Sequence, residues 1–93
     1  MKLENKVAIV TGGAMGNGYG IAEVFLKLGA NVIILDYSDK LGEALNKLSA
    51  ISKNILGYKV DITNKELVDK IIDDIITIIL IKSLIFIFPP QIL

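Results

Sequence analysis

The chain has 93 residues, a length that suits one domain. Its 10 basic and 10 acidic residues balance, every basic residue is lysine and none form a block, so the sequence gives no support for a nucleic-acid partner. Cysteine and histidine are absent, which excludes disulfides, thiol nucleophiles and the commonest zinc ligands, and we assign no metal ligand. Because residues 1–6 are mostly polar and the apolar run after them is short, we expect no signal peptide and a cytoplasmic location.

The first expected element is a buried parallel strand at residues 7–11, which are apolar without alternation. A glycine-rich run continues to Gly18, and a helical pattern starts near Tyr19 and ends at Gly29. Glycines in such a run let the backbone approach a ligand, and the helix after them directs free N–H groups at an anion. This order predicts a phosphate-binding loop, with a tight turn that binds no ligand as the alternative. The helix is expected to bury Ile21, Ala22, Val24, Phe25 and Leu28.

Strands and helices continue to alternate along the chain. We expect a strand at residues 31–36, a helix from 38 or 39 to 49, and a strand at 55–60. Thr63 and Glu66 match a capping box before a third helix. The pattern predicts an α/β fold, the N-terminal half of a Rossmann-type doubly wound parallel sheet. The residues expected to be buried in the second and third helices are Leu41, Ala44, Leu45, Leu48, and the pairs Leu67/Val68, Ile71/Ile72 and Ile75/Ile76.

The pattern changes after Ile76, and residues 78–88 are almost continuously apolar except for Lys82 and Ser83. We therefore divide the chain into a partial dinucleotide-binding domain, 1–77, and an apolar tail, 78–93. The tail fits either a buried fourth strand or a membrane span, but a span needs roughly 17–25 apolar residues and this stretch is shorter. Without a fourth strand, the first strand becomes an exposed sheet edge through which copies of the chain are expected to associate.

The spacing T-G-x-x-x-G-x-G at residues 11–18 resembles the short-chain dehydrogenase/reductase family. The flanking sequence also resembles this family, with K-V-A-I-V-T-G-G-A from Lys6, G-I-A-E-V-F from Gly20 and G-A-N-V-I from Gly29. The resemblance implies an oxidoreductase, usually a homo-oligomer, that transfers a hydride between NAD(H) and an alcohol or ketone. The Asn-Asn-Ala-Gly motif of the family is missing here, which suggests a truncated or frameshifted reading frame.

The resemblance also implies which residues bind the cofactor. Asp36 would accept hydrogen bonds from the adenosine ribose and repel a 2′-phosphate. NADP-preferring relatives place a cation at the positions of Met15 and Tyr37, so NAD(H) is expected to be preferred over NADP(H). Asp61 and Ile62 match the pair that contacts the adenine. The remaining expected contacts, mostly to the pyrophosphate, are Thr11, Gly12, Gly16, Asn17 and Gly18.

Two of these assignments have alternatives that the residues leave open. Asp36 could be a solvated carboxylate at a strand end or a cap for the next helix. Asp61 could serve only to start the helix that follows it. Asn17 stands where the family usually has an apolar residue, but it keeps the backbone N–H that would meet the phosphate.

No catalytic residue is assigned. The family's catalytic Ser, and the Tyr and Lys of its Y-x-x-x-K motif, lie beyond position 93, and Tyr19, Tyr37 and Tyr58 have no lysine four residues later. We therefore expect the nucleotide-binding part of an oxidoreductase, inactive alone. The alternatives are a non-catalytic nucleotide-binding module and a small protein whose apolar tail mediates interaction or membrane contact.

Overall fold

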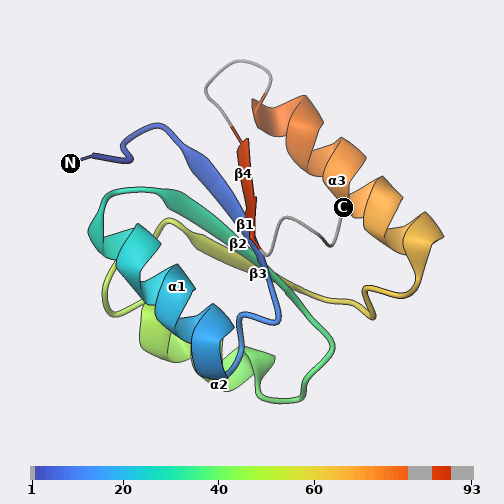
Figure 1. Ribbon diagram of the computed structural model, residues 1–93, viewed down its shortest axis with the longest axis horizontal. Coiled ribbons are helices and arrows are strands. Elements are labelled where there is room, and N and C mark those ends of the chain that lie inside the picture. Colours follow the sequence, from blue (N-terminus) through green and yellow to red (C-terminus); the bar gives the residue numbers. More distant parts are fainter. Residues whose placement is uncertain (1, 80–84, 89–93) are drawn as a thin grey trace.

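The computed structural model describes residues 2–79 and 85–88, which form a parallel sheet with helices on both faces (Figure 1). The sheet has four strands in the order β3-β2-β1-β4, and every neighbouring pair is parallel. This confirms the α/β, Rossmann-type fold. The elements are β1 Val7–Thr11, α1 Gly16–Lys27, β2 Asn31–Asp36, α2 Leu41–Leu48, β3 Ile55–Lys59, α3 Lys65–Ile79 and β4 Ile85–Phe88.

The order in which successive strands are added to the sheet reverses at β1. Strands β2 and β3 follow on one side of β1, and the chain then returns through α3 so that β4 pairs with the other side. In open parallel sheets, ligands bind beyond the carboxyl ends of the strands at such a switch point. The loop after β1 is therefore the position at which the fold favours a site.

Helices α1 and α2 cover one face of the sheet and α3 covers the other (Figure 1). Along β1, Ala8 and Val10 pack into the cluster shared with α1 and α2, whereas Val7 and Ile9 pack into the cluster shared with α3. Both sets are buried. This two-sided burial explains why the strand sequence is apolar without alternation.

Helix α1 differs in two ways from the sequence expectation. It begins at Gly16 rather than near Tyr19, because its glycine-rich first turn carries no apolar periodicity. Its buried residues are Ala22 and Leu26, and the expectation for Val24 was wrong because its side chain is 52% exposed. Two residues along a helix correspond to a rotation of about 200°, which places Val24 away from the buried face.

The end of α1 was predicted correctly. Gly29 has a φ of 92°, a left-handed conformation that favours glycine. The N–H of Ala30 donates to the carbonyl of Phe25 at 3.0 Å, and the N–H of Gly29 donates to the carbonyl of Leu26 at 3.0 Å. These are the hydrogen bonds of a Schellman motif, which satisfies the last carbonyls of a helix.

The expected capping box at the start of α3 is wrong. The N–H of Leu67 donates to the side-chain oxygen of Asn64 at 3.1 Å, so Asn64 caps the helix. The Thr63 hydroxyl instead donates to Asp61. Of the expected apolar pairs, Val68, Ile71 and Ile75 are buried, Ile72 is partly buried, and Leu67 and Ile76 are exposed, because a helix buries only one stripe.

Helix α2 is shorter than expected and begins at Leu41. The residues before it form a turn in which the Ser38 hydroxyl accepts a hydrogen bond from the N–H of Lys40 at 3.0 Å. Its buried residues are Leu41, Ala44 and Leu48, as expected, and Leu45 is partly buried.

The apolar tail contributes the fourth strand. Residues of β4 pair in register with β1, from Val7 with Ile85 to Val10 with Phe88. The structure therefore supports the fourth-strand alternative for the tail, and β4 covers the edge of β1 that would otherwise be exposed. Helix α3 crosses the expected boundary at residue 77, and Lys82 and Ser83 lie outside the described residues. Within the described residues, no helix is both long and apolar enough to cross a membrane.

Candidate functional site

The glycine-rich loop is built tightly at the carboxyl end of β1. The N–H of Gly12 donates to the carbonyl of Leu35 at 2.9 Å, which continues the pairing with β2 beyond the buried Thr11. Gly12 and Gly16 have φ angles of 67° and 58°, in the region that favours glycine. A Cβ on Gly18 would lie 2.2 Å from the Gly12 carbonyl oxygen. The glycines therefore allow α1 to start directly against the loop.

The first turn of α1 is left open to an anion. Met15 occupies the N-cap position with φ −146° and ψ 162°, and it makes no side-chain capping hydrogen bond. The first turn holds no acidic residue, and Asn17 within it is exposed. Unpaired N–H groups and the positive end of the helix dipole together favour a phosphate at such a terminus.

Asp36 joins this loop to the loop after β2. Its Oδ2 accepts a hydrogen bond from the N–H of Ala14 at 2.9 Å, and its Oδ1 accepts one from the N–H of Ser38 at 2.8 Å. It does not cap α2, which begins only at Leu41. Because each carboxylate oxygen can accept two hydrogen bonds, Asp36 can hold the loop and still accept from a ligand hydroxyl.

The two loops that Asp36 joins each carry an exposed side chain: Met15 lies in the glycine-rich loop, and Tyr37 directly follows Asp36. Met15 is 57% exposed and Tyr37 is 67% exposed, so neither brings a positive charge to the site. The structure adds a cation that sequence reasoning missed, because Lys40 lines a hollow of about 350 Å³ together with Met15 and Gly16. The hollow lies between the glycine loop and α2, and only the tertiary fold brings Lys40 there.

A second missed cation lies on the neighbouring strand. Lys59, the last residue of β3, is the strand partner of Asp36, but its Nζ pairs with Asp39 Oδ1 at 2.5 Å. The hydrogen bond and the attraction between the two charges lower the pKa of Asp39 and raise the pKa of Lys59. No sequence motif indicates this pair, because it depends on the register of β3 against β2.

Asp61 and Ile62 follow β3 at the same end of the sheet, where the N–H of Val60 donates to the carbonyl of Asp36 at 3.0 Å. Asp61 Oδ1 accepts from the Thr63 hydroxyl at 2.7 Å and from the Thr63 N–H at 2.9 Å, and these bonds lower the pKa of Asp61. They form a turn before α3, as the helix-start alternative requires. Among the described residues nothing bonds to Oδ2, which leaves that oxygen available to a ligand.

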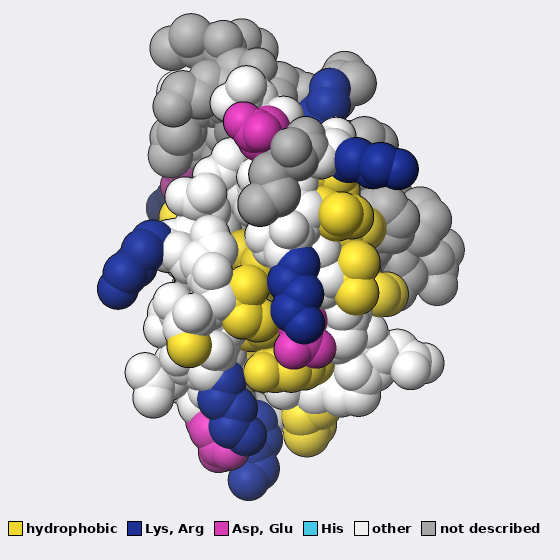
Figure 2. Space-filling model, turned by 90° about the vertical axis from the view of Figure 1, so that its left-hand side faces the viewer, with side chains coloured by type: hydrophobic (Ala, Val, Ile, Leu, Met, Phe, Trp, Pro, Cys, Tyr) yellow, Lys and Arg dark blue, Asp and Glu magenta, His cyan; other side chains and the backbone are white. Residues whose placement is uncertain are grey.

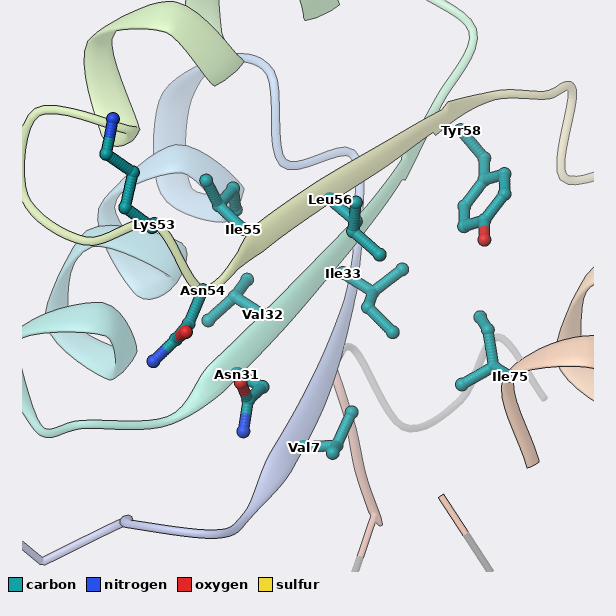
Figure 3. A pocket seen from close by; sticks show the side chains of 10 residues that line it. All are labelled: Val7, Asn31, Val32, Ile33, Lys53, Asn54, Ile55, Leu56, Tyr58 and Ile75. Atoms are coloured by element: carbon teal, nitrogen blue, oxygen red, sulfur yellow. The ribbon is translucent and has the colours of Figure 1, made fainter. Parts of the chain in front are cut away.

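A different hollow lies at the opposite end of the strands (Figure 3). It has a volume of about 300 Å³ and is lined by the first residues of three strands, Val7, Asn31 and Ile55, and by the apolar side chains of Leu56 and Ile75. Because ligands of parallel sheets bind beyond the carboxyl ends, we do not assign the nucleotide to this hollow. Within the described residues, no cluster of acidic side chains could hold a metal ion.

The surface charges are mixed. Figure 2 shows lysines spread over one face, several of them beside acidic side chains and between hydrophobic areas. Lys27 pairs with Glu23 at 3.7 Å in α1, and Lys47 pairs with Glu43 at 3.2 Å in α2. The charges of these two lysines are therefore partly neutralised by acidic residues on the same helix.

Residues 6–83 match the family model described as short chain dehydrogenase, and this match identifies the family. This chain belongs to the short-chain dehydrogenase family. It is 37% identical over 73 residues to zerumbone synthase of Zingiber zerumbet, a match that spans 78% of this chain and 27% of that protein. The chain thus corresponds to only part of the length of this relative.

Solved short-chain dehydrogenases share the fold. The NAD-bound enzyme from Mycobacterium paratuberculosis superimposes with a TM-score of 0.74 and 28% identity, over 85% of this chain and 34% of that one. A metagenomic short-chain oxidoreductase in complex with NADP gives a TM-score of 0.80 at 21% identity, over 91% and 39% of the two chains, and shows the shared fold alone.

Proposed function

We propose that this chain forms the nicotinamide-nucleotide-binding part of a short-chain oxidoreductase and that it prefers NAD(H). The carrying observation is the arrangement at the carboxyl ends of β1 and β2. There the loop that leads into the uncapped start of α1 is joined to the Asp36 carboxylate by the hydrogen bond from the N–H of Ala14. The helix start suits the pyrophosphate, and the carboxylate suits the adenosine ribose.

The other proposed contacts surround these two groups. Thr11, Gly12, Gly16 and Gly18 shape the loop, and the backbone of Asn17 meets a phosphate. In this proposal Met15 and Tyr37 flank the ribose, and Asp61 Oδ2 and Ile62 contact the adenine. When bound, the nicotinamide ring would exchange a hydride with an alcohol or ketone. This chain's own residues bind and orient the nucleotide, and we assign no catalytic group among them.

Solved proteins with this fold are found with NAD and with NADP, so the fold does not decide the cofactor preference. We base the preference on this chain's own residues. Asp36 repels a 2′-phosphate. NADH should therefore bind about tenfold more tightly than NADPH, a difference typical of one unpaired charge. Titration of the 93-residue chain with each cofactor, followed by nicotinamide fluorescence, measures the ratio.

Asp36→Ala should weaken NADH binding and bring the two affinities together, because the ribose acceptor and the repulsion are both lost. Asp69→Asn, which removes the same charge from α3 on the other face of the sheet (Figure 1), is the control and should leave both affinities unchanged. Equal affinity of the unmodified chain for NADH and NADPH would refute the proposed role of Asp36.

The chain alone should not reduce carbonyl compounds. The family's acid–base tyrosine is not among these residues, and general acid catalysis contributes about 10²- to 10⁴-fold to a rate. A purified sample assayed with NADH and a panel of ketones and aldehydes should show no turnover above background. Measurable turnover would mean that catalytic groups among these residues have been overlooked.

We retain three further expectations for the molecule as a whole. Residues 1–77 carry the nucleotide-binding unit and residues 78–93 form a separate apolar tail, although the family model extends to residue 83 and the tail supplies β4 to the sheet. Copies of the chain associate through an outer strand of the sheet, β3 or β4, because β1 has a neighbouring strand on each side. A cytoplasmic location remains the expectation from the sequence.

A further inference from the structure

We propose that the ion pair between Asp39 and Lys59 determines how strongly the site rejects a cofactor with a 2′-phosphate. The inference rests on the proposed function, because it concerns the same ribose subsite. It adds two specificity-determining residues, neither of which stands at the positions where the family resemblance led us to look for a cation.

Lys59 is placed beside the ribose-binding carboxylate by the sheet itself. It is the strand partner of Asp36, and paired residues of adjacent strands lie about 5 Å apart with their side chains on the same face. The lysine is therefore the basic residue that the register brings next to Asp36. Its long side chain can reach past the strand end toward a phosphate on a bound ribose.

The ammonium group nevertheless does not neutralise Asp36. Both oxygens of Asp36 accept backbone hydrogen bonds, from Ala14 and Ser38, whereas Lys59 Nζ bonds to Asp39. Each partner shifts the pKa of the other toward its charged form, so the pair is ionised at neutral pH. The negative charge of Asp36 therefore stays available to repel a 2′-phosphate.

The pair is exposed enough to open without unfolding the protein. The side chains of Lys59 and Asp39 are 54% and 94% exposed, and ion pairs at this exposure contribute little to stability. Loss of the Asp39 carboxylate would release Lys59 at the ribose edge. The other charges near this edge, among the described residues, are Asp61, which follows β3, Lys40, which lines the hollow beside the loop, and the Glu43–Lys47 pair of α2.

The test compares the ratio of the dissociation constants of NADPH and NADH in four proteins: the unmodified chain, Asp39→Asn, Lys59→Gln and the double variant. Asp39→Asn should lower the ratio about three- to tenfold, the range expected when one exposed cation is freed to meet a doubly charged phosphate. Lys59→Gln alone should not lower the ratio, because it frees no cation, and the double variant should lose the decrease seen in Asp39→Asn. The shift should shrink in high salt, because exposed charges are screened.

Asp69→Asn is the charge-matched control, since it breaks the exposed Lys65–Asp69 pair on α3, and it should not change the ratio. An unchanged ratio in Asp39→Asn, or a lowered ratio that persists in the double variant, would overturn the inference while leaving NAD(H) binding intact. If the unmodified chain binds neither cofactor, the proposed function itself fails and the inference fails with it. Circular dichroism of each variant establishes that the comparison is made between folded proteins.

Discussion

Gly18 and Gly20 both lie in α1, but only Gly18 packs against the glycine loop. A Cβ on Gly18 would lie 2.2 Å from the Gly12 carbonyl oxygen, whereas a Cβ on Gly20 would meet nothing within 4 Å. Gly18→Ala should therefore lower the free energy of unfolding by about 1–3 kcal/mol, as overpacking does. Gly20→Ala should raise it by about 0.5–1 kcal/mol, because alanine is the better helix former.

Urea unfolding of the two variants beside the unmodified chain measures the difference between two substitutions that are chemically identical. Equal effects at the two positions would show that the loop does not require its close approach to α1. Gly18→Ala should also weaken NADH binding, because the displaced loop would no longer present its N–H groups in the same arrangement.

Helix α3 offers a test at the scale of an element, since its cap is Asn64 and not the expected pair of Thr63 and Glu66. Asn64→Ala should cost about 1 kcal/mol of stability, the usual effect of losing an N-cap. Glu66→Ala is the control and should change stability by less than about 0.5 kcal/mol, because this side chain makes no capping bond. Thermal unfolding of both variants measures this, and a larger loss for Glu66→Ala would restore the capping box.

At the scale of the whole molecule, we expect concentration-dependent association through the β3 edge. Leu56 on this edge strand is 58% exposed and lines the apolar hollow of Figure 3, and an exposed apolar strand edge invites a second copy. Leu56→Glu should reduce association in sedimentation velocity with little loss of stability, because this side chain is already in water. Val24→Glu, which replaces a similarly exposed residue on α1, is the control.

A monodisperse monomer over a wide concentration range would contradict this expectation. It would also favour the non-catalytic binding module over a fragment that depends on further chain, because the sheet would then be self-sufficient. A decrease in association that is equal in the two variants would indicate that general surface hydrophobicity, rather than the β3 edge, drives it.

The sequence alone determined the alternation of strands and helices and the glycine loop, and it singled out Asp36 as the proposed ribose carboxylate. These follow from local rules. The buried strands are apolar because both of their faces are covered, Gly29 ends a helix because it can adopt a positive φ, and Asp36 stands at a strand end. Errors arose where one face of a helix had to be chosen, as at Val24, or where neighbouring polar residues competed for a cap, as at Thr63 and Asn64.

The tertiary structure decided what depends on distant parts of the chain. The apolar tail became a strand because β1 offered it a partner, and Lys59 came beside Asp36 because β3 pairs with β2 in one register. The bond from Ala14 to Asp36 joins residues that are far apart in sequence, and Lys40 reaches the glycine loop only when α2 packs beside it. Such contacts have no local signal, because strand register and helix packing are set by the burial of the whole sheet rather than by neighbouring residues.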